Sequence, residues 1–343
     1  MRLLAIESSC DDTAAAVLVD GQVRSNVVAS QDTVHHVYGG VVPELASRSH
    51  MRALTPTVAR ALRDAGVALD DIDAVAATYG PGLVGSLLVG LCAAKAIAYA
   101  RRLPFVGVNH LEGHLLSAQI ERPVAFPYAA LLVSGGHTAL YLARAPGDYV
   151  LLGSTRDDAA GEAFDKVAKL LGLGYPGGRV IDALARRGDA RAIRFPRARL
   201  KPAGAGHRFD FSFSGIKTAV AMHLHERAAE PSAHADIAAS FQEAVIDMLL
   251  DTAFAAARST GVDRLVLAGG VSANSRLRER ALAAAAESGV EVVFPAPRYC
   301  TDNAAMIGLA AAYRLERGER DDLTLNAAAV ADLGTPPPTD ASR

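Results

Sequence analysis

Short apolar runs of strand length alternate with longer apolar or amphipathic runs along almost the whole chain. This alternation of the two hydrophobic periods predicts an α/β protein. In the first third of the chain, strands are expected at residues 2–9, 14–20, 73–82 and 104–110, and helices at residues 43–66 and 83–102.

The pattern of the first hairpin returns later in the chain. Residues 3–19, LLAIESSCDDTAAAVLV, place a polar turn between two apolar strands, and residues 128–144, YAALLVSGGHTALYLAR, place a polar, glycine-bearing turn between two more. The two hairpins lie about 125 residues apart, which indicates one structural unit used twice.

The second half of the chain is less regular. Residues 182–230 show no clear period, whereas residues 234–261 predict a long helix and residues 263–289 predict a strand, a glycine turn and a helix. The last nine residues, TPPPTDASR, have the composition of a disordered tail.

Composition narrows the class of protein. The 343 residues are 50% hydrophobic, which suffices for about two domains with substantial cores. Formal net charge is -2, so nothing global attracts nucleic acid or an anionic membrane, and a polyanionic partner would need a local basic patch. The three cysteines are scattered and form no C-x-x-C pair, which fits a reducing cytoplasm rather than a disulfide framework.

Neither a membrane span nor a signal peptide is expected. Residues 74–94 carry no charge, but Gly80-Pro81-Gly82 divides them into a strand and a helix, and Lys95 follows directly. We therefore expect a buried helix there. The amino terminus meets acidic residues after only a few apolar ones, unlike a signal peptide.

The stretch NHLEGH, residues 109–114, contains two histidines at helical spacing. On a helix, His110 and His114 would lie one turn apart on one face, where both rings can reach one metal ion. In metalloproteases of the H-E-x-x-H type the general base directly follows the first histidine, whereas here Leu111 follows it and Glu112 is rotated off that face. The local pattern leaves open a metal site or a polar patch on a partly exposed helix.

Three glycine-bearing turns suggest a nucleotide. Glycine at a turn lets backbone N–H groups approach phosphate oxygens or a nucleoside without a Cβ in the way. The third turn follows a strand and opens a helix, where an anion or nucleotide can lie across the helix start. The turns are Ser134–His137, Gly177–Gly178 and Gly269–Asn274.

Several aspartates accompany these turns. Most aspartates in proteins are solvated or cap a helix, and Asp302 could equally cap a helix starting at Asn303. The aspartates that recur beside the motifs are Asp11, Asp12, Asp165, Asp182 and Asp302.

Together these motifs resemble the TsaD family, the catalytic subunits of tRNA threonylcarbamoyladenosine synthesis, formerly described as O-sialoglycoprotein endopeptidases. The resemblance runs from about residue 1 to residue 330, and the motifs appear in the family's order. They are IESSCDDT, NHLEGH, LLVSGGHTAL, DDAAGEAFDKVAKLLGLGYPGG, FSFSGIKTA, LAGGVSAN and CTDNAAMIG.

The resemblance implies a fold and a reaction. The fold is the actin/Hsp70-like ATPase fold, with two lobes of duplicated ribonuclease-H-like units around a nucleotide cleft. We expect a first lobe at residues 1–125, to which part of the C-terminal helix returns, a second lobe at 126–334 with an irregular basic insert at about 186–210, and a disordered tail at 335–343. The reaction moves the threonylcarbamoyl group from threonylcarbamoyl-AMP to N6 of adenosine 37 in tRNAs that read codons beginning with A.

The resemblance also implies roles for individual residues. His110, His114 and Asp302 would bind one divalent metal ion, iron in the family, with zinc or magnesium as alternatives. The adenylate substrate would be held by Leu132, Val133, Ser134, Gly135, Gly136, Asp165, Gly178, Asp182 and Asn274. Expected partners are a separate synthase that makes threonylcarbamoyl-AMP, a TsaB-like pseudoenzyme and a TsaE-like ATPase.

A general base is expected beside the adenine amine, which is a weak nucleophile. Asp11 and Asp12 are the candidates. The bacterial family commonly has Glu where this chain has Asp12, and the aspartate reaches about one methylene less far.

Other classes of protein remain to be weighed. Glycine turns and acidic residues are shared by sugar and acetate kinases of the same superfold, and fold does not fix function. A small-molecule carbamoyltransferase would share the adenylate and metal chemistry but usually carries a further adenylate-forming domain. A metallopeptidase would need an acid adjacent to the metal, and a non-catalytic scaffold would not need the full set of site residues.

The chain contains one strongly basic run. Eight basic residues against the single acid Asp189 predict a surface for the tRNA phosphates, although such a run can also be a simple solvated surface. The eight are Arg186, Arg187, Arg191, Arg194, Arg197, Arg199, Lys201 and Arg208.

Overall fold

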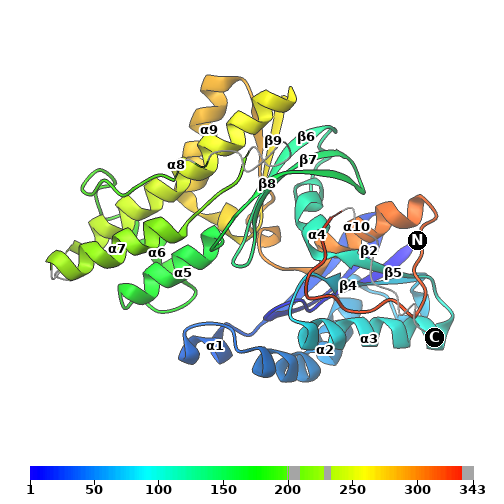
Figure 1. The fold of residues 1–343 in the computed structure, drawn as a ribbon. Coiled ribbons are helices and arrows are strands. Elements are labelled where there is room, and N and C mark those ends of the chain that lie inside the picture. The colour runs from blue at the N-terminus through cyan, green and yellow to red at the C-terminus, as the bar shows by residue number, and fades with distance from the viewer. Residues whose placement is uncertain (199, 201–208, 228–232, 334–343) are drawn as a thin grey trace. The chain divides into compact units, whose positions relative to one another are not determined.

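The computed structural model describes residues 1–198, 200, 209–227 and 233–333. The chain forms two compact units, drawn as a ribbon in Figure 1. Unit 1 contains Met1–Val124, Ala145–Tyr149 and Thr301–Arg343, and unit 2 contains Ala125–Arg144 and Val150–Cys300. Cys10, Cys92 and Cys300 are free thiols.

Unit 1 is built on a five-stranded mixed sheet of the described residues. The strand order is β3-β2-β1-β4-β5, in which β1 pairs antiparallel with β2, β2 antiparallel with β3, and β4 lies parallel to both β1 and β5. The strands are β1 (Arg2–Glu7), β2 (Asp12–Val19), β3 (Gln22–Ser30), β4 (Ala74–Gly80) and β5 (Phe105–Asn109). The central strands are buried on both faces, as continuous apolar runs require.

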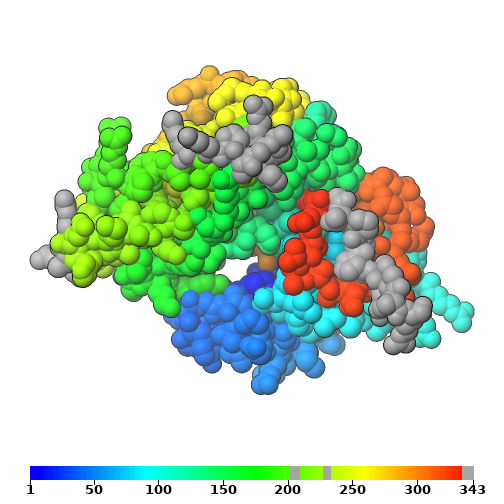
Figure 2. All heavy atoms as spheres, viewed as in Figure 1, coloured from blue at the N-terminus to red at the C-terminus, as the bar shows by residue number. Residues whose placement is uncertain are grey.

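Helices cover both faces of this sheet. The long helix α2 buries one face and exposes the other, and its exposed side chains are among the blue spheres of Figure 2. Its apolar residues pack with those of α3, β1 and β4 in one core. The helices of unit 1 are α1 (Asp32–His35), α2 (Pro43–Ala65), α3 (Val84–Arg101), α4 (His110–Leu116) and α10 (Ala304–Glu316).

Helix α3 has the length and composition of a membrane-crossing helix, the one such helix in the described parts of the chain. Leu87, Leu91 and Ala94 nevertheless lie buried in the core of unit 1. Between β4 and α3 the chain turns at Gly80, Pro81 and Gly82, as expected from the sequence.

Unit 2 repeats the sheet of unit 1. The order in the described residues is β10-β9-β6-β7-β8, with β6 antiparallel to β7 and parallel to β9, and β9 parallel to β10. Strand β6 therefore corresponds to β1, β7 to β2 and β9 to β4, which confirms the repeat seen in the sequence. The strands are β6 (Tyr128–Val133), β7 (Thr138–Ala145), β8 (Asp148–Ser154), β9 (Arg264–Ala268) and β10 (Glu291–Val293).

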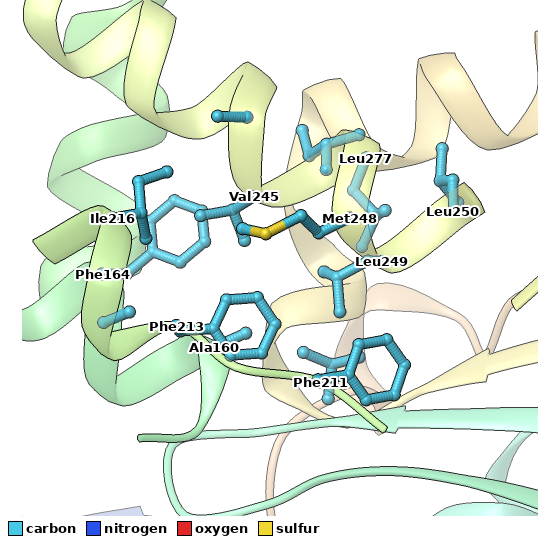
Figure 3. Packing of buried hydrophobic residues seen from close by; sticks show 14 of the residues in the cluster. Ala160, Phe164, Phe211, Phe213, Ile216, Val245, Met248, Leu249, Leu250 and Leu277 are labelled. Atoms are coloured by element: carbon cyan, nitrogen blue, oxygen red, sulfur yellow. The ribbon is translucent and has the colours of Figure 1, made fainter. Parts of the chain in front are cut away.

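The core of unit 2 lies between this sheet and its helices. Figure 3 shows Phe164 of α5 beside Ile216 of α7 and Val245 of α8, with Phe211 and Phe213 below them. Phe211 and Phe213 stack with ring centroids 6.1 Å apart. The helices are α5 (Ala160–Leu170), α6 (Gly177–Ala185), α7 (Ser214–Arg227), α8 (His234–Thr260) and α9 (Ser275–Ser288).

The expectation of an irregular stretch from 182 to 230 is wrong at both ends. Helix α6 continues to Ala185, and α7 occupies residues 214–227. The α7 sequence has almost no apolar periodicity, although Ile216 and Val220 pack in the core, and polar contacts hold its start. The carboxylate of Asp157 accepts hydrogen bonds from the hydroxyls of Ser212 and Ser214 and from the N–H of Phe213. Strands β3 and β8 were also not predicted.

The predicted tail at residues 335–343 lies outside the described residues, as do Arg199, Lys201 and Arg208 of the basic run.

Candidate metal centre and nucleotide-binding turns

Helix α4 carries both histidines on one face. It begins directly after β5, where the side chain of Asn109 caps it by accepting a hydrogen bond from the N–H of Leu111 at 2.9 Å. The rings of His110 and His114 meet edge to face with centroids 4.7 Å apart. Both imidazoles are buried, so neither belongs to a solvated polar patch.

Asp302 faces the two histidines from the start of α10. Its Oδ1 lies 3.1 Å from Nε2 of His114 and 3.5 Å from Nε2 of His110. Asp302 is not the helix cap, because Asn303 takes that position and accepts a hydrogen bond from the N–H of Met306. The alternative role considered for Asp302 is therefore wrong.

Gly113 explains why α4 and α10 approach so closely. A Cβ at this residue would lie 2.9 Å from Cδ1 of Ile307 and 3.1 Å from Cγ of Met306. A larger residue here would force the side chains of Ile307 and Met306 to shift.

The three side chains fit a divalent metal ion. One ligand atom from each of His110, His114 and Asp302 lies within 4.8 Å of the others, and two imidazole nitrogens with one carboxylate oxygen form a common donor set for transition metals. Three protein ligands also leave coordination positions open for a substrate.

Glu7 is the site residue that sequence reasoning missed. Its fully buried carboxylate lies 3.0 Å from Nδ1 of His110, and it also accepts hydrogen bonds from the N–H of Ser9 and the hydroxyl of Thr78, both at 2.5 Å. A carboxylate on the second nitrogen of a metal-binding histidine fixes the ring and its tautomer. The sequence feature that could have revealed Glu7 is that it is the one acidic residue at the end of an otherwise apolar strand.

The charges of this group depend on one another. Burial disfavours a charged imidazole at His110, but the carboxylates of Asp302 and Glu7 outweigh burial and hold the pKa of His110 well above its ordinary value. Burial of Asp302 is likewise outweighed by His110, which holds the pKa of Asp302 well below its usual range. Burial lowers the pKa of His114, which favours the neutral, ligating form.

Asp11 ends the turn between β1 and β2, and Asp12 is the first residue of β2. Burial and the negative charges of Asp302 and Asp11 raise the pKa of Asp12 to about 7. Burial and the charge of Asp302 also raise the pKa of Asp11. Both carboxyls thus feel the field of Asp302, in the same unit as the three candidate ligands.

Glu112 points away from the candidate ligands. Its buried Oε1 accepts a hydrogen bond from the hydroxyl of Tyr149 at 3.1 Å, and burial raises the pKa of this carboxyl. It does not occupy the place of the general base of a metallopeptidase. Tyr149 is a second residue that sequence reasoning did not single out.

The first glycine turn of unit 2, Ser134–His137, packs tightly against neighbouring backbone on one side and leaves open space beside Gly135 and Gly136. Ser134 closes it by donating its N–H to the carbonyl of His137 at 2.8 Å. A Cβ on Gly161 or Gly269 would lie 2.4 Å from the carbonyl oxygen of Ser134 or Val133, so the turn packs tightly against both glycines. A Cβ on Gly135 or Gly136 would meet nothing within 4 Å.

The remaining candidate residues each make hydrogen bonds within unit 2. Asp165 accepts the N–H of Gly177 at 2.7 Å, and a Cβ on Gly178 would again meet nothing. Asp182 accepts the hydroxyl of Ser275 at 2.8 Å. Asn274 caps α9 through its oxygen, and its amide nitrogen donates to Gln242 at 2.7 Å.

Comparison with known proteins decides the family. A profile of the family described as TsaD, tRNA N6-adenosine threonylcarbamoyltransferase, matches residues 22–309. The chain belongs to this family.

Its relatives within the TsaD family match over nearly their whole length. The chain is 57% identical over 331 residues to the tRNA N6-adenosine threonylcarbamoyltransferase of Anaeromyxobacter sp. (strain Fw109-5), covering 95% of this chain and 98% of the relative. It is 58% identical over 330 residues to that of Anaeromyxobacter dehalogenans (strain 2CP-1), with the same coverage.

Solved structures support the fold alone. A full-length HypF in a phosphate- and nucleotide-bound form superposes with a TM-score of 0.63 at 14% identity, covering 92% of this chain and 56% of HypF. The (R)-2-hydroxyglutaryl-CoA dehydratase component A of Acidaminococcus fermentans gives 0.55 at 16% identity, covering 91% and 99%. With the two matching sheets, these likenesses confirm the expected fold class.

If His110, His114 and Asp302 bind a metal, His114→Ala and Asp302→Asn will each lower the metal content of the purified protein. The alanine variant also leaves a cavity, because His114 is fully buried, and large-to-small changes in cores cost on the order of 2–5 kcal/mol. His50→Ala is the matched control, since His50 is a buried histidine of the same unit outside the group. Wild-type metal content in both test variants would contradict the assignment.

If Tyr149 and Glu112 set the rotation of α4, Glu112→Leu and Tyr149→Phe will weaken metal binding although neither residue is a ligand. Glu112→Gln should retain most of the affinity, because its amide oxygen can still accept the tyrosine hydroxyl. Metal titration with circular dichroism measures both affinity and folding. Equal affinity for the Leu and Gln variants would show that the hydrogen bond does not position the helix.

If phosphate approaches the first glycine turn, Gly136→Val will weaken binding of a non-hydrolysable adenylate analogue. A Cβ at this position meets no protein atom within 4 Å, so we attribute the weakening to a clash with the ligand. Gly215→Val in α7 is the matched control, because it also enters open space. Calorimetric titration measures both, and unchanged affinity in Gly136→Val would place the phosphate elsewhere.

If Asn274 contacts the nucleoside, Asn274→Ala will weaken binding of the same analogue by about 1–2 kcal/mol, because the side chain no longer offers its polar groups to the ligand. It will also lower the free energy of unfolding by about 1 kcal/mol, because the α9 cap is removed. Asn274→Ser keeps a capping oxygen and separates the two effects. Full analogue affinity in the stably folded serine variant would argue against the contact.

Proposed function

We propose that this chain transfers the threonylcarbamoyl group from threonylcarbamoyl-AMP to N6 of adenosine 37 in tRNAs that read codons beginning with A. The observation that carries this proposal is the match to tRNA N6-adenosine threonylcarbamoyltransferases at 57% and 58% identity over 95% of the chain. The residue group His110, His114 and Asp302 supports it, because a sugar or acetate kinase of the same fold would not need it.

Unit 2 would hold the adenylate. The open positions at Gly135 and Gly136 let backbone N–H groups approach the phosphate, and Gly178 offers a second open position at the start of α6. Leu132 and Val133, buried at the end of β6, would fix the turn beneath the phosphate. Asp165 holds the α6 start, and Asp182 and Asn274 would contact the nucleoside.

The metal-binding group would act on the donor's acyl phosphate. A bound divalent ion supplies Lewis-acid stabilisation of charge on a carbonyl or phosphate oxygen. Glu7 holds the Nδ1 side of His110 and so directs its Nε2 toward Asp302. We propose iron(II), because two histidines and one carboxylate with open positions are typical of iron(II) sites, and zinc and magnesium are the alternatives.

Asp12 is the preferred general base. A base is most effective when its pKa lies near the working pH, and burial with the neighbouring carboxylates raises the pKa of Asp12 to about 7. It would accept the proton that N6 of adenine loses as the carbon–nitrogen bond forms, while AMP leaves from the carbamoyl carbon. Asp11 is the alternative.

Partners follow from this chemistry. Threonylcarbamoyl-AMP must be made by a separate synthase, since the reaction proposed here consumes it. We propose a TsaB-like pseudoenzyme and a TsaE-like ATPase as further partners, as expected for the family. We propose that the reaction takes place in the cytoplasm, with tRNA as its substrate.

Incubation of the chain and its partners with threonylcarbamoyl-AMP and unmodified tRNA should yield threonylcarbamoyladenosine after digestion to nucleosides and mass spectrometry. Asp12→Asn should lower kcat by roughly 10²- to 10⁴-fold, the usual contribution of a general base, with adenylate affinity unchanged.

Asp11→Asn distinguishes the two aspartates. Only the variant that lacks the true base should lose the acidic limb of the pH–rate profile. No modified nucleoside from the wild-type assembly would refute the transfer reaction. Wild-type kcat in both aspartate variants would refute only the assignment of the base.

A further inference from the structure

The basic run predicted from the sequence divides into two parts in the structure. Arg197 turns inward, where its guanidinium donates to Asp247 at 2.8 and 3.1 Å and to the carbonyl of Phe195 at 2.7 Å. Arg187, Arg191 and Arg194 are exposed, and among the described residues none of them has an ion pair. A variant of Arg197 would therefore test an internal contact, whereas the other three test a surface.

The backbone that carries these three arginines is fixed. Asp189 donates its N–H to Asp236 at 2.7 Å, and the hydroxyl of Ser240 accepts the N–H of Ile193 at 3.1 Å. A Cβ on Gly188 would lie 2.0 Å from the carbonyl oxygen of Ala235, so this segment is pressed against the first turns of α8. Phe195 is buried at its far end.

Positive charge dominates this part of unit 2. Between Arg179 and Arg194 the chain has five arginines and two aspartates. Both aspartates already have hydrogen-bond partners. Asp182 accepts hydrogen bonds from the hydroxyl of Ser275 and the guanidinium of Arg186, and Asp189 accepts one from the backbone N–H of Arg191. Exposed arginines on a fixed backbone, without acidic partners, favour a polyanion over a protein surface of mixed charge.

The three arginines lie in the segment that follows α6, the helix whose start belongs to the proposed adenylate site. Helix α6 runs from Gly177 to Ala185, and the arginine segment follows it directly. At 1.5 Å per residue, Arg186 lies about 12 Å along the helix from Gly178. An adenosine must leave its stack to react, and the flanking phosphates then remain on the protein surface beside the site.

We infer that Arg187, Arg191 and Arg194 form a docking surface for the sugar–phosphate backbone of tRNA next to the reacting adenosine. This inference rests on the proposed function for the identity of the polyanion. The surface comes from exposed side chains and backbone contacts within unit 2. The contacts go to phosphates and so position the RNA without reading its sequence.

The test is a triple variant of the full chain, Arg187→Ala/Arg191→Ala/Arg194→Ala, titrated with unmodified tRNA at several salt concentrations. Removal of one arginine–phosphate contact should reduce the slope of log K against log salt by about 0.7–0.9, so removal of three should reduce it by about 2.1–2.7. The Kd at moderate salt should rise by at least about tenfold. Affinity for the adenylate analogue should remain that of the wild type.

Two control variants test whether the effect depends on these three arginines or on the loss of any positive charge. Arg197→Ala removes an arginine of the same run but should leave the salt slope unchanged. Arg258→Ala removes an exposed arginine at the other end of α8, about 27 Å along the helix from Ser240, and should also have no effect. The inference would be overturned if either control variant lowered the salt slope by as much as one arginine contributes in the triple variant.

The outcome is distinguishable from failure of the proposed function. If the wild type modifies tRNA, the triple variant should show a raised KM for tRNA with kcat preserved at saturation. Wild-type Kd and salt slope in the triple variant would overturn the docking surface and leave the transfer reaction standing. If the triple variant folds poorly by circular dichroism, the three single variants, each expected to lower the slope by about 0.7–0.9, decide the question.

Discussion

A buried carboxylate at the end of β1 organises the candidate metal centre. Glu7 is fully buried, and a charge there is tolerable only because the Ser9 N–H, the Thr78 hydroxyl and the His110 ring all turn toward it. These three groups come from the turn after β1, from β4 and from α4. The same contacts that satisfy the charge therefore hold the sheet, the turn and the histidine helix in one arrangement, and they direct the free nitrogen of His110 toward Asp302.

The two units use equivalent turns for different chemistry. In unit 1 the connection from β1 to β2 is flanked by Glu7, the last residue of β1, and contains Asp11 directly before Asp12, the first residue of β2. In unit 2 the turn after β6 carries Gly135 and Gly136. The first position concentrates negative charge near the candidate metal ligands, and the second removes side chains where an anion can approach. A repeated topology thus provides two positions of similar geometry, and the residue types at each position decide what it can bind.

The sequence predicted the parts of the structure that depend on local pattern. The repeated hairpins, α2, α3, α8 and the strand–turn–helix around Asn274 follow from hydrophobic period and glycine placement. The candidate ligand group His110, His114 and Asp302 followed from the motifs once the family resemblance was seen. Helix α7 was missed because it is fixed by Asp157, more than 50 residues away, and Glu7 was missed because its partners, Thr78 and His110, are remote in the chain. The inward turn of Arg197 toward Asp247 is likewise a tertiary contact that composition cannot reveal.

The discontinuity of unit 1 affects how the protein is made. His114 and Asp302 are 188 residues apart, and the whole of unit 2 is synthesised between them. At about 5–20 residues per second, a ribosome needs roughly 10 to 40 s to pass from one to the other. During that interval the histidine helix lacks both α10, against which Gly113 packs, and the third ligand. The candidate metal centre is therefore complete only late in biosynthesis, because Asp302 and α10 are made after the whole of unit 2.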